Sequence, residues 1–88
     1  MRAVIEVLGR PHVGCVVRNL SEGGALVEPI DTTFLPHAFG LRLGGSNALI
    51  QCETVRSMGR TYGVTFKDAG GSAGAAAKRA IRRALFAA

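Results

Sequence analysis

The residues best suited to chemistry lie in one short turn, within VVRNLSEGGALV (16–27). Asn19 and Ser21 bring an amide and a hydroxyl, and two adjacent glycines, Gly23 and Gly24, follow them. The two polar groups can bond to the backbone of their own turn or offer a donor and an acceptor to the edge of a base. Adjacent glycines permit positive φ and let a ligand approach the backbone. The residue types therefore allow either a self-capped turn or a turn that presents its polar groups to a ligand.

Six apolar segments of strand character must position this turn. Turns containing glycine or proline separate them, and residues such as Tyr62, Val64 and Phe66 alternate as on one face of a strand. Short strands at regular spacing predict an all-β fold, and we expect a small six-stranded antiparallel barrel, whose closure leaves no edge strand exposed. The predicted strands are 2–8, 13–20, 25–30, 39–43, 48–57 and 61–66.

The charged residues divide the chain into a nearly neutral body and a basic tail. Residues 1–72 carry seven Lys or Arg and six acids, whereas 73–88 carry four Lys or Arg and no acid. The tail has the pattern of an amphipathic helix, with Ala and Ile on one side and the cations on the other. We expect a barrel over 1–68, a linker over 69–72 and a C-terminal helix over 73–88. The basic face of that helix is either solvated or meets an anion.

Composition restricts the class of protein further. A chain of 88 residues, 48% of them hydrophobic, predicts one small globular domain. No apolar run approaches the roughly 18–20 residues of a membrane span and no signal peptide is evident, so a cytoplasmic protein is expected. Cys15 and Cys52 are expected to be reduced and buried. They do not combine with His12 and His37 in the spacing of a zinc site, so no metal is predicted. No catalytic arrangement is evident either, and we expect no enzyme.

The turn and its flanking strands resemble the PilZ domain family, a six-stranded barrel usually followed by a helix and known for binding cyclic di-GMP. The signature of that family is Asp or Asn, any residue, Ser, any two residues, Gly, and it is met by Asn19, Ser21 and Gly24. The segment YGVTFKD (62–68) is similar to the family's closing strand. The resemblance covers about residues 2–68. It implies a non-catalytic receptor or adaptor that passes nucleotide occupancy to a partner protein.

The resemblance also implies a second motif, which is incomplete in this chain. In the family, two arginines four residues apart on the N-terminal segment bind the phosphates and stack on guanine. Arg2 can stand for one of them, Arg18 adjoins the turn, and the other arginine has no equivalent. The expected nucleotide site is therefore degenerate and consists of Arg2, Arg18, Asn19, Ser21 and Gly24.

Other arginines form the same spacing elsewhere in the chain. The strings at 56–60 and 79–83 lie downstream of the turn, and a chain with nine arginines produces about one such string by chance. We therefore take neither as evidence of the second motif. The helix cations Arg79, Arg82 and Arg83 are nevertheless a source of substitute charge.

Two other functions stay open. A PilZ-like module without nucleotide would dock a protein partner, as the resemblance implies for family members in type IV pilus assembly. The residues around Phe34, Leu35 and Phe39 are either an exposed apolar patch for that partner or buried under the mouth of the barrel. Nucleic-acid binding through the basic helix is the third hypothesis. It is the less favoured one, because the aromatic residues of the strands look like core residues rather than a stacking platform.

Overall fold

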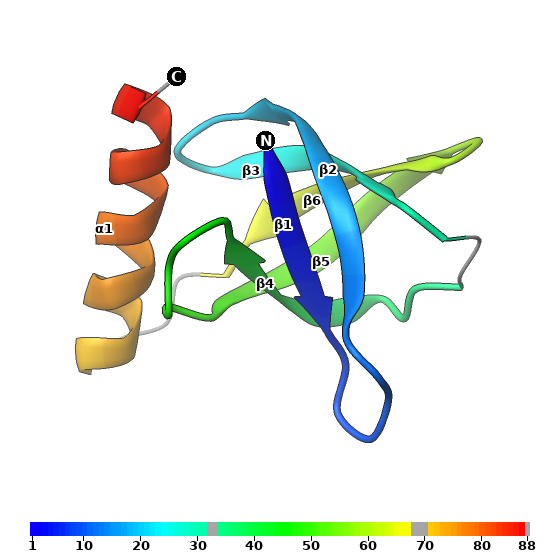
Figure 1. Cartoon of the computed structure of the whole chain (residues 1–88), viewed down its shortest axis with the longest axis horizontal. Coiled ribbons are helices and arrows are strands. Elements are labelled where there is room, and N and C mark those ends of the chain that lie inside the picture. The colour runs from blue at the N-terminus through cyan, green and yellow to red at the C-terminus, as the bar shows by residue number, and fades with distance from the viewer. Residues whose placement is uncertain (32–33, 68–70, 88) are drawn as a thin grey trace.

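The strands of this protein close into a barrel, with one helix against its side (Figure 1). The computed structural model describes residues 1–31, 34–67 and 71–87 of the chain. Around the barrel the antiparallel strands follow the order β1-β2-β3-β6-β5-β4, and β4 pairs with β1 to complete the ring. The predicted six-stranded antiparallel barrel with a C-terminal helix is confirmed. The elements are β1 (Arg2–Glu6), β2 (Val13–Leu20), β3 (Gly24–Pro29), β4 (Ala38–Leu43), β5 (Ile50–Met58), β6 (Thr61–Phe66) and α1 (Gly71–Ala87).

Proline and glycine residues mark several of the strand ends and turns. β3 ends at Pro29, which cannot donate a further ladder hydrogen bond. β1 ends at Glu6, two residues before the predicted end, and Leu8 lies fully exposed in the following turn. The glycines with positive φ in the described chain are Gly9, Gly45 and Gly59, at 79°, 78° and 60°. Each lies in a turn between strands, where other residues would be strained.

The core fills the inside of the barrel through the alternation of the strands. Ala3 and Ile5 of β1 and Cys15 and Val17 of β2 are buried, and the residues between them face outward. Leu35 and Phe39 also belong to the core, at 7% and 4% exposure. Of the two alternatives for the candidate patch, burial therefore holds for these two residues, whereas Phe34 is exposed.

Helix α1 packs on the barrel through one face. Ala80 and Ile81 are buried, Ala77 and Ala84 pack against the core, and α1 contacts β4. The predicted amphipathic orientation is confirmed, since the cations at 78, 79, 82 and 83 are exposed. Of the predicted linker 69–72, the first two residues lie outside the described residues and the last two belong to α1, which also begins before the predicted start.

Candidate functional site

The turn between β2 and β3 is held in place by hydrogen bonds to its own backbone and to β6. Ser21 donates twice to the carbonyl of Gly24, from its backbone N–H at 2.9 Å and from Oγ at 3.2 Å. The carbonyl of Gly23 accepts from the N–H of Phe66 at 2.9 Å and from Oγ1 of Thr65 at 3.3 Å. Ser21 therefore caps the turn, and its hydroxyl proton is directed to the backbone rather than outward.

Gly24 is required by packing rather than by its backbone angle. Neither Gly23 nor Gly24 has a positive φ, so the turn does not use the positive φ that these glycines permit. A Cβ on Gly24 would lie 2.2 Å from the carbonyl oxygen of Val64 in β6, whereas one on Gly23 would meet nothing within 4 Å. The glycine of the motif thus allows β3 and β6 to approach each other.

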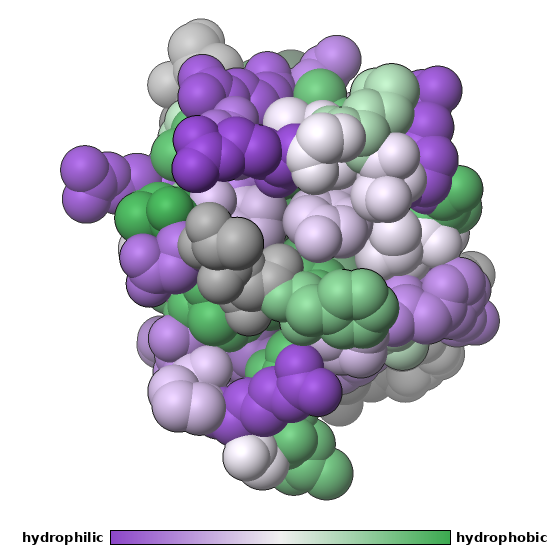
Figure 2. Space-filling model, turned by 90° about the vertical axis from the view of Figure 1, so that its right-hand side faces the viewer, coloured by the Kyte–Doolittle hydropathy of each residue, from purple (hydrophilic) through white to green (hydrophobic). Residues whose placement is uncertain are grey.

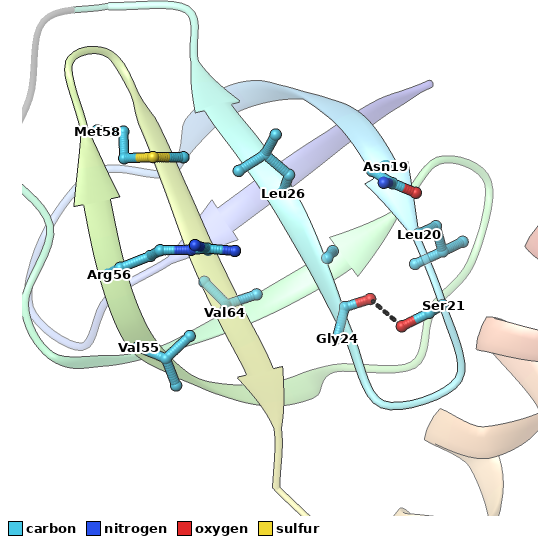
Figure 3. A pocket seen from close by; sticks show the side chains of 11 residues that line it. Asn19, Leu20, Ser21, Gly24, Leu26, Val55, Arg56, Met58 and Val64 are labelled. Carbon is cyan, nitrogen blue, oxygen red and sulfur yellow. Dashed lines mark hydrogen bonds between the residues drawn. The ribbon is translucent and has the colours of Figure 1, made fainter.

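The turn forms one wall of an open depression of about 330 Å³ on the outside of the barrel. Figure 3 shows Asn19 and Ser21 on one side of it and Arg56 on the other, with Leu26 and Val64 between them. The side chain of Asn19 is exposed and makes no hydrogen bond to the described part of the chain. The structure therefore brings together three of the five predicted site residues, Asn19, Ser21 and Gly24. The complete lining is Asn19, Leu20, Ser21, Gly24, Ala25, Leu26, Val55, Arg56, Met58, Gly63 and Val64.

Two irregularities of the strands border this depression. The pairing of β2 with β3 passes from Val17–Val27 to Asn19–Leu26, so Arg18 is an extra residue in β2. The pairing of β5 with β6 likewise skips Val55. Such bulges bend a strand and redirect its side chains, and they are over-represented beside active sites. Since β2, β3, β6 and β5 are consecutive in the barrel, the two bulges lie on opposite sides of one surface.

The two predicted phosphate-binding arginines do not line the depression. Arg18 is ion-paired with Glu28 of β3, with its Nε and Nη2 at 3.1 and 3.0 Å from Oε1. Arg2 lies at the start of β1, where it pairs with Val16, three residues before Asn19. Sequence reasoning placed the charge on the N-terminal side of the turn because the family motif lies there.

Sequence reasoning missed Arg56, the cation that does line the depression. Its position in a strand, beside a partner strand that carries Gly63, was the available signal. That signal cannot be connected with the turn until the strand order is known, because β3 and β6 lie between β5, which carries Arg56, and the turn at the end of β2. The spacing with Arg60 plays no part in it, since Arg60 follows the hairpin glycine, Gly59, and does not line the depression.

The helix cations lie on a different side of the turn. Glu22 shares a hollow of about 250 Å³ with Lys78, Ile81 and Arg82 of α1. Arg83 lines a separate cavity of about 600 Å³, beside Met1 and the β4–β5 connection. The cations of α1 therefore do not line the depression that Asn19 opens on.

The two cysteines and the two histidines do not line the depression. Burial raises the pKa of the Cys15 thiol to about 11 and that of Cys52 to about 12, where the nearby Cys15 adds to the shift. Both thiols are free and protonated at neutral pH. His12 lies 3.7 Å from Glu6 and His37 lies 3.9 Å from Glu53. Within residues 1–31, 34–67 and 71–87, no three such side chains are grouped to hold a metal ion, and no helix is long and apolar enough to cross a membrane.

On the face drawn in Figure 2, the exposed apolar residues do not join into one large patch. The face that carries the β3–β4 connection and the β5–β6 hairpin shows small apolar islands among hydrophilic residues (Figure 2). Val55 and Met58, exposed by 65% and 52%, are the two that line the depression. These two exposed apolar side chains therefore belong to the same depression as Asn19 and Arg56.

Comparison with known proteins adds no relative to these observations. No family model matches the chain, and no curated protein or solved structure matches it. The fold is established by the strand order itself, and the function is argued from the site.

Proposed function

We propose that this protein is a PilZ-type receptor for cyclic di-GMP, without catalytic activity, that transmits nucleotide occupancy to a partner protein. The observation that carries the proposal is the Asn19 amide, which has no hydrogen-bond partner among the described residues and faces a depression that also contains an arginine. An Asn side chain offers both an acceptor and a donor, which suits the edge of a purine. The hydrogen bonds of Ser21 and Gly23 keep the turn ordered, so binding does not have to pay its ordering entropy.

The first test is titration calorimetry with cyclic di-GMP, on the unaltered chain and on Asn19→Ala. We expect Asn19→Ala to weaken binding about twofold to tenfold, the equivalent of one net hydrogen bond. Asn47→Ala is the matched control, because Asn47 is exposed, does not line the depression, and accepts from Arg42 through its backbone carbonyl only. An unaltered chain that gives no heat at about a hundred micromolar nucleotide contradicts the proposal.

The alternative function is a module that binds a protein partner independently of nucleotide. The exposed Val55 and Met58 favour it, because both line one depression and exposed apolar side chains on the outside of a barrel suit a protein contact. It also fits the incomplete arginine motif and the pilus-related members of the family that the sequence resembles. This alternative is selected over the receptor function if a partner is captured in equal amounts with and without cyclic di-GMP and is no longer captured by Met58→Ser.

A further inference from the structure

The depression holds an arginine, Arg56, that has no acidic partner among the described residues. Arg18 is paired with Glu28, Arg42 with Glu6, and Lys67 with Glu53. Arg56 makes no ion pair or hydrogen bond to the described residues. Across the depression lies Asn19, whose amide makes no hydrogen bond to the described residues either. An anionic ligand placed between the two side chains would complete this arrangement.

The position of Arg56 follows from the missing side chain of Gly63. In the β5–β6 ladder Arg56 pairs with Gly63. A Cβ on Gly63 would lie 3.3 Å from Cγ of Arg56 and 3.5 Å from its Nε, so the arginine stem lies over the bare glycine backbone. Figure 3 shows the side chain extending from β5 across β6 toward β3 and the turn. The guanidinium therefore reaches into the depression from the side opposite Asn19.

The bulge at Val55 places an apolar side chain beside this arginine. Because Val55 is the extra residue of the bulge, both it and Arg56 accompany Gly63, and Val55 Cγ2 lies 3.8 Å from the Cβ position of that glycine. Val55 and Met58 thus line the depression on the side of Arg56, and Leu26 lies between that side and Asn19. Apolar side chains next to a guanidinium offer a surface for the flat face of a base, with the charge at its edge.

We infer that Arg56 is the phosphate-binding residue of this site and replaces, from β5, the arginines that are missing before the turn. The inference rests on the proposed function and assigns to the ligand two contacts, a phosphate on Arg56 and a base edge on Asn19. A guanidinium binds phosphate through two parallel hydrogen bonds, a geometry that lysine does not reproduce. Because the depression is small and open, these few polar contacts dominate the affinity.

The test compares cyclic di-GMP titrations of the unaltered chain with those of Arg56→Ala, Arg56→Lys and Arg60→Ala. Arg60 is the matched control, because it is exposed, belongs to the same hairpin and does not line the depression. We expect Arg56→Ala to weaken binding about tenfold to a hundredfold, the loss of a charged hydrogen-bond pair. The affinity of Arg56→Lys should lie between those of Arg56→Ala and the unaltered chain. Arg60→Ala should bind cyclic di-GMP as tightly as the unaltered chain does. Since Arg56 is exposed, equal melting temperatures will show that each variant is folded.

The dependence on salt separates a phosphate contact from a structural role. Screening weakens a contact between charges, so the affinity of the unaltered chain should fall more steeply with ionic strength than that of Arg56→Ala. If Arg56→Ala binds as tightly as Arg60→Ala, or keeps the full salt dependence, Arg56 is not the phosphate-binding residue although the receptor function stands. If the unaltered chain does not bind the nucleotide, the receptor function and this assignment both fail.

Discussion

At the scale of single residues, the turn separates a structural role from the proposed binding role within one motif. Ser21 and Gly24 are used by the protein, because the hydroxyl caps the turn and the missing Cβ lets two strands meet. Asn19 is the motif residue whose side chain makes no bond to the described chain. Part of such a motif can therefore persist for folding alone, and the evidence for a ligand rests on Asn19 and the residue it faces.

The neighbouring glycines of the turn allow a matched test of this structural role. We expect Gly24→Ala to lower the free energy of unfolding by about 1–3 kcal/mol, because the new methyl group would overlap the Val64 carbonyl and force β3 away from β6. Gly23→Ala should change it by less than about 0.5 kcal/mol, since that Cβ meets nothing and the φ is not positive. Urea unfolding of both variants is the measurement. Equal midpoints would show that the strands can move apart without cost.

At the scale of elements, the sequence predicted the strands and the helix well, because each leaves a local pattern. β2 and β6 have the predicted bounds, and the helix buries the predicted face. The bulges at Arg18 and Val55 have no local signature here, since they become visible only when two strands are aligned. The cation of the site could not be predicted for the same reason. Arg56 and Asn19 are 37 positions apart in the sequence, and they line one depression only because β3 and β6 lie between their strands.

The helix offers two apolar residues that differ mainly in burial. Ile81 is 5% exposed against the barrel, whereas Phe86, one and a half turns later, is 88% exposed. Ile81→Ala should destabilise the protein by about 2–4 kcal/mol, through lost contacts and the cavity that it leaves. Phe86→Ala should change stability by less than about 0.5 kcal/mol. Thermal melts followed by circular dichroism measure both. A large loss in Phe86→Ala would mean that the end of α1 packs more closely than the structure has it.

At the scale of the whole molecule, the charge and the candidate site are in different places. Four of the eleven cations lie on α1 and face solvent, while the depression holds the single arginine of β5. A basic helix attracts any polyanion, and that attraction falls steeply with salt. A nucleotide site with two specific contacts depends instead on the side chains that line it. Anion binding by this protein can therefore have two origins, which substitutions can separate.

Replacing Arg79, Arg82 and Arg83 by Gln should leave the affinity for cyclic di-GMP within about twofold, because none of the three lines the depression. The same variant should lose whatever weak binding of a labelled single-stranded oligonucleotide the protein has at low salt. Asn19→Ala should have the opposite effect: binding of cyclic di-GMP should weaken, and binding of the oligonucleotide should not change. Calorimetry for the one ligand and fluorescence anisotropy at two salt concentrations for the other make the comparison. Loss of cyclic di-GMP binding in the helix variant, with none in Asn19→Ala, would place the anion on α1 and leave the barrel as its scaffold.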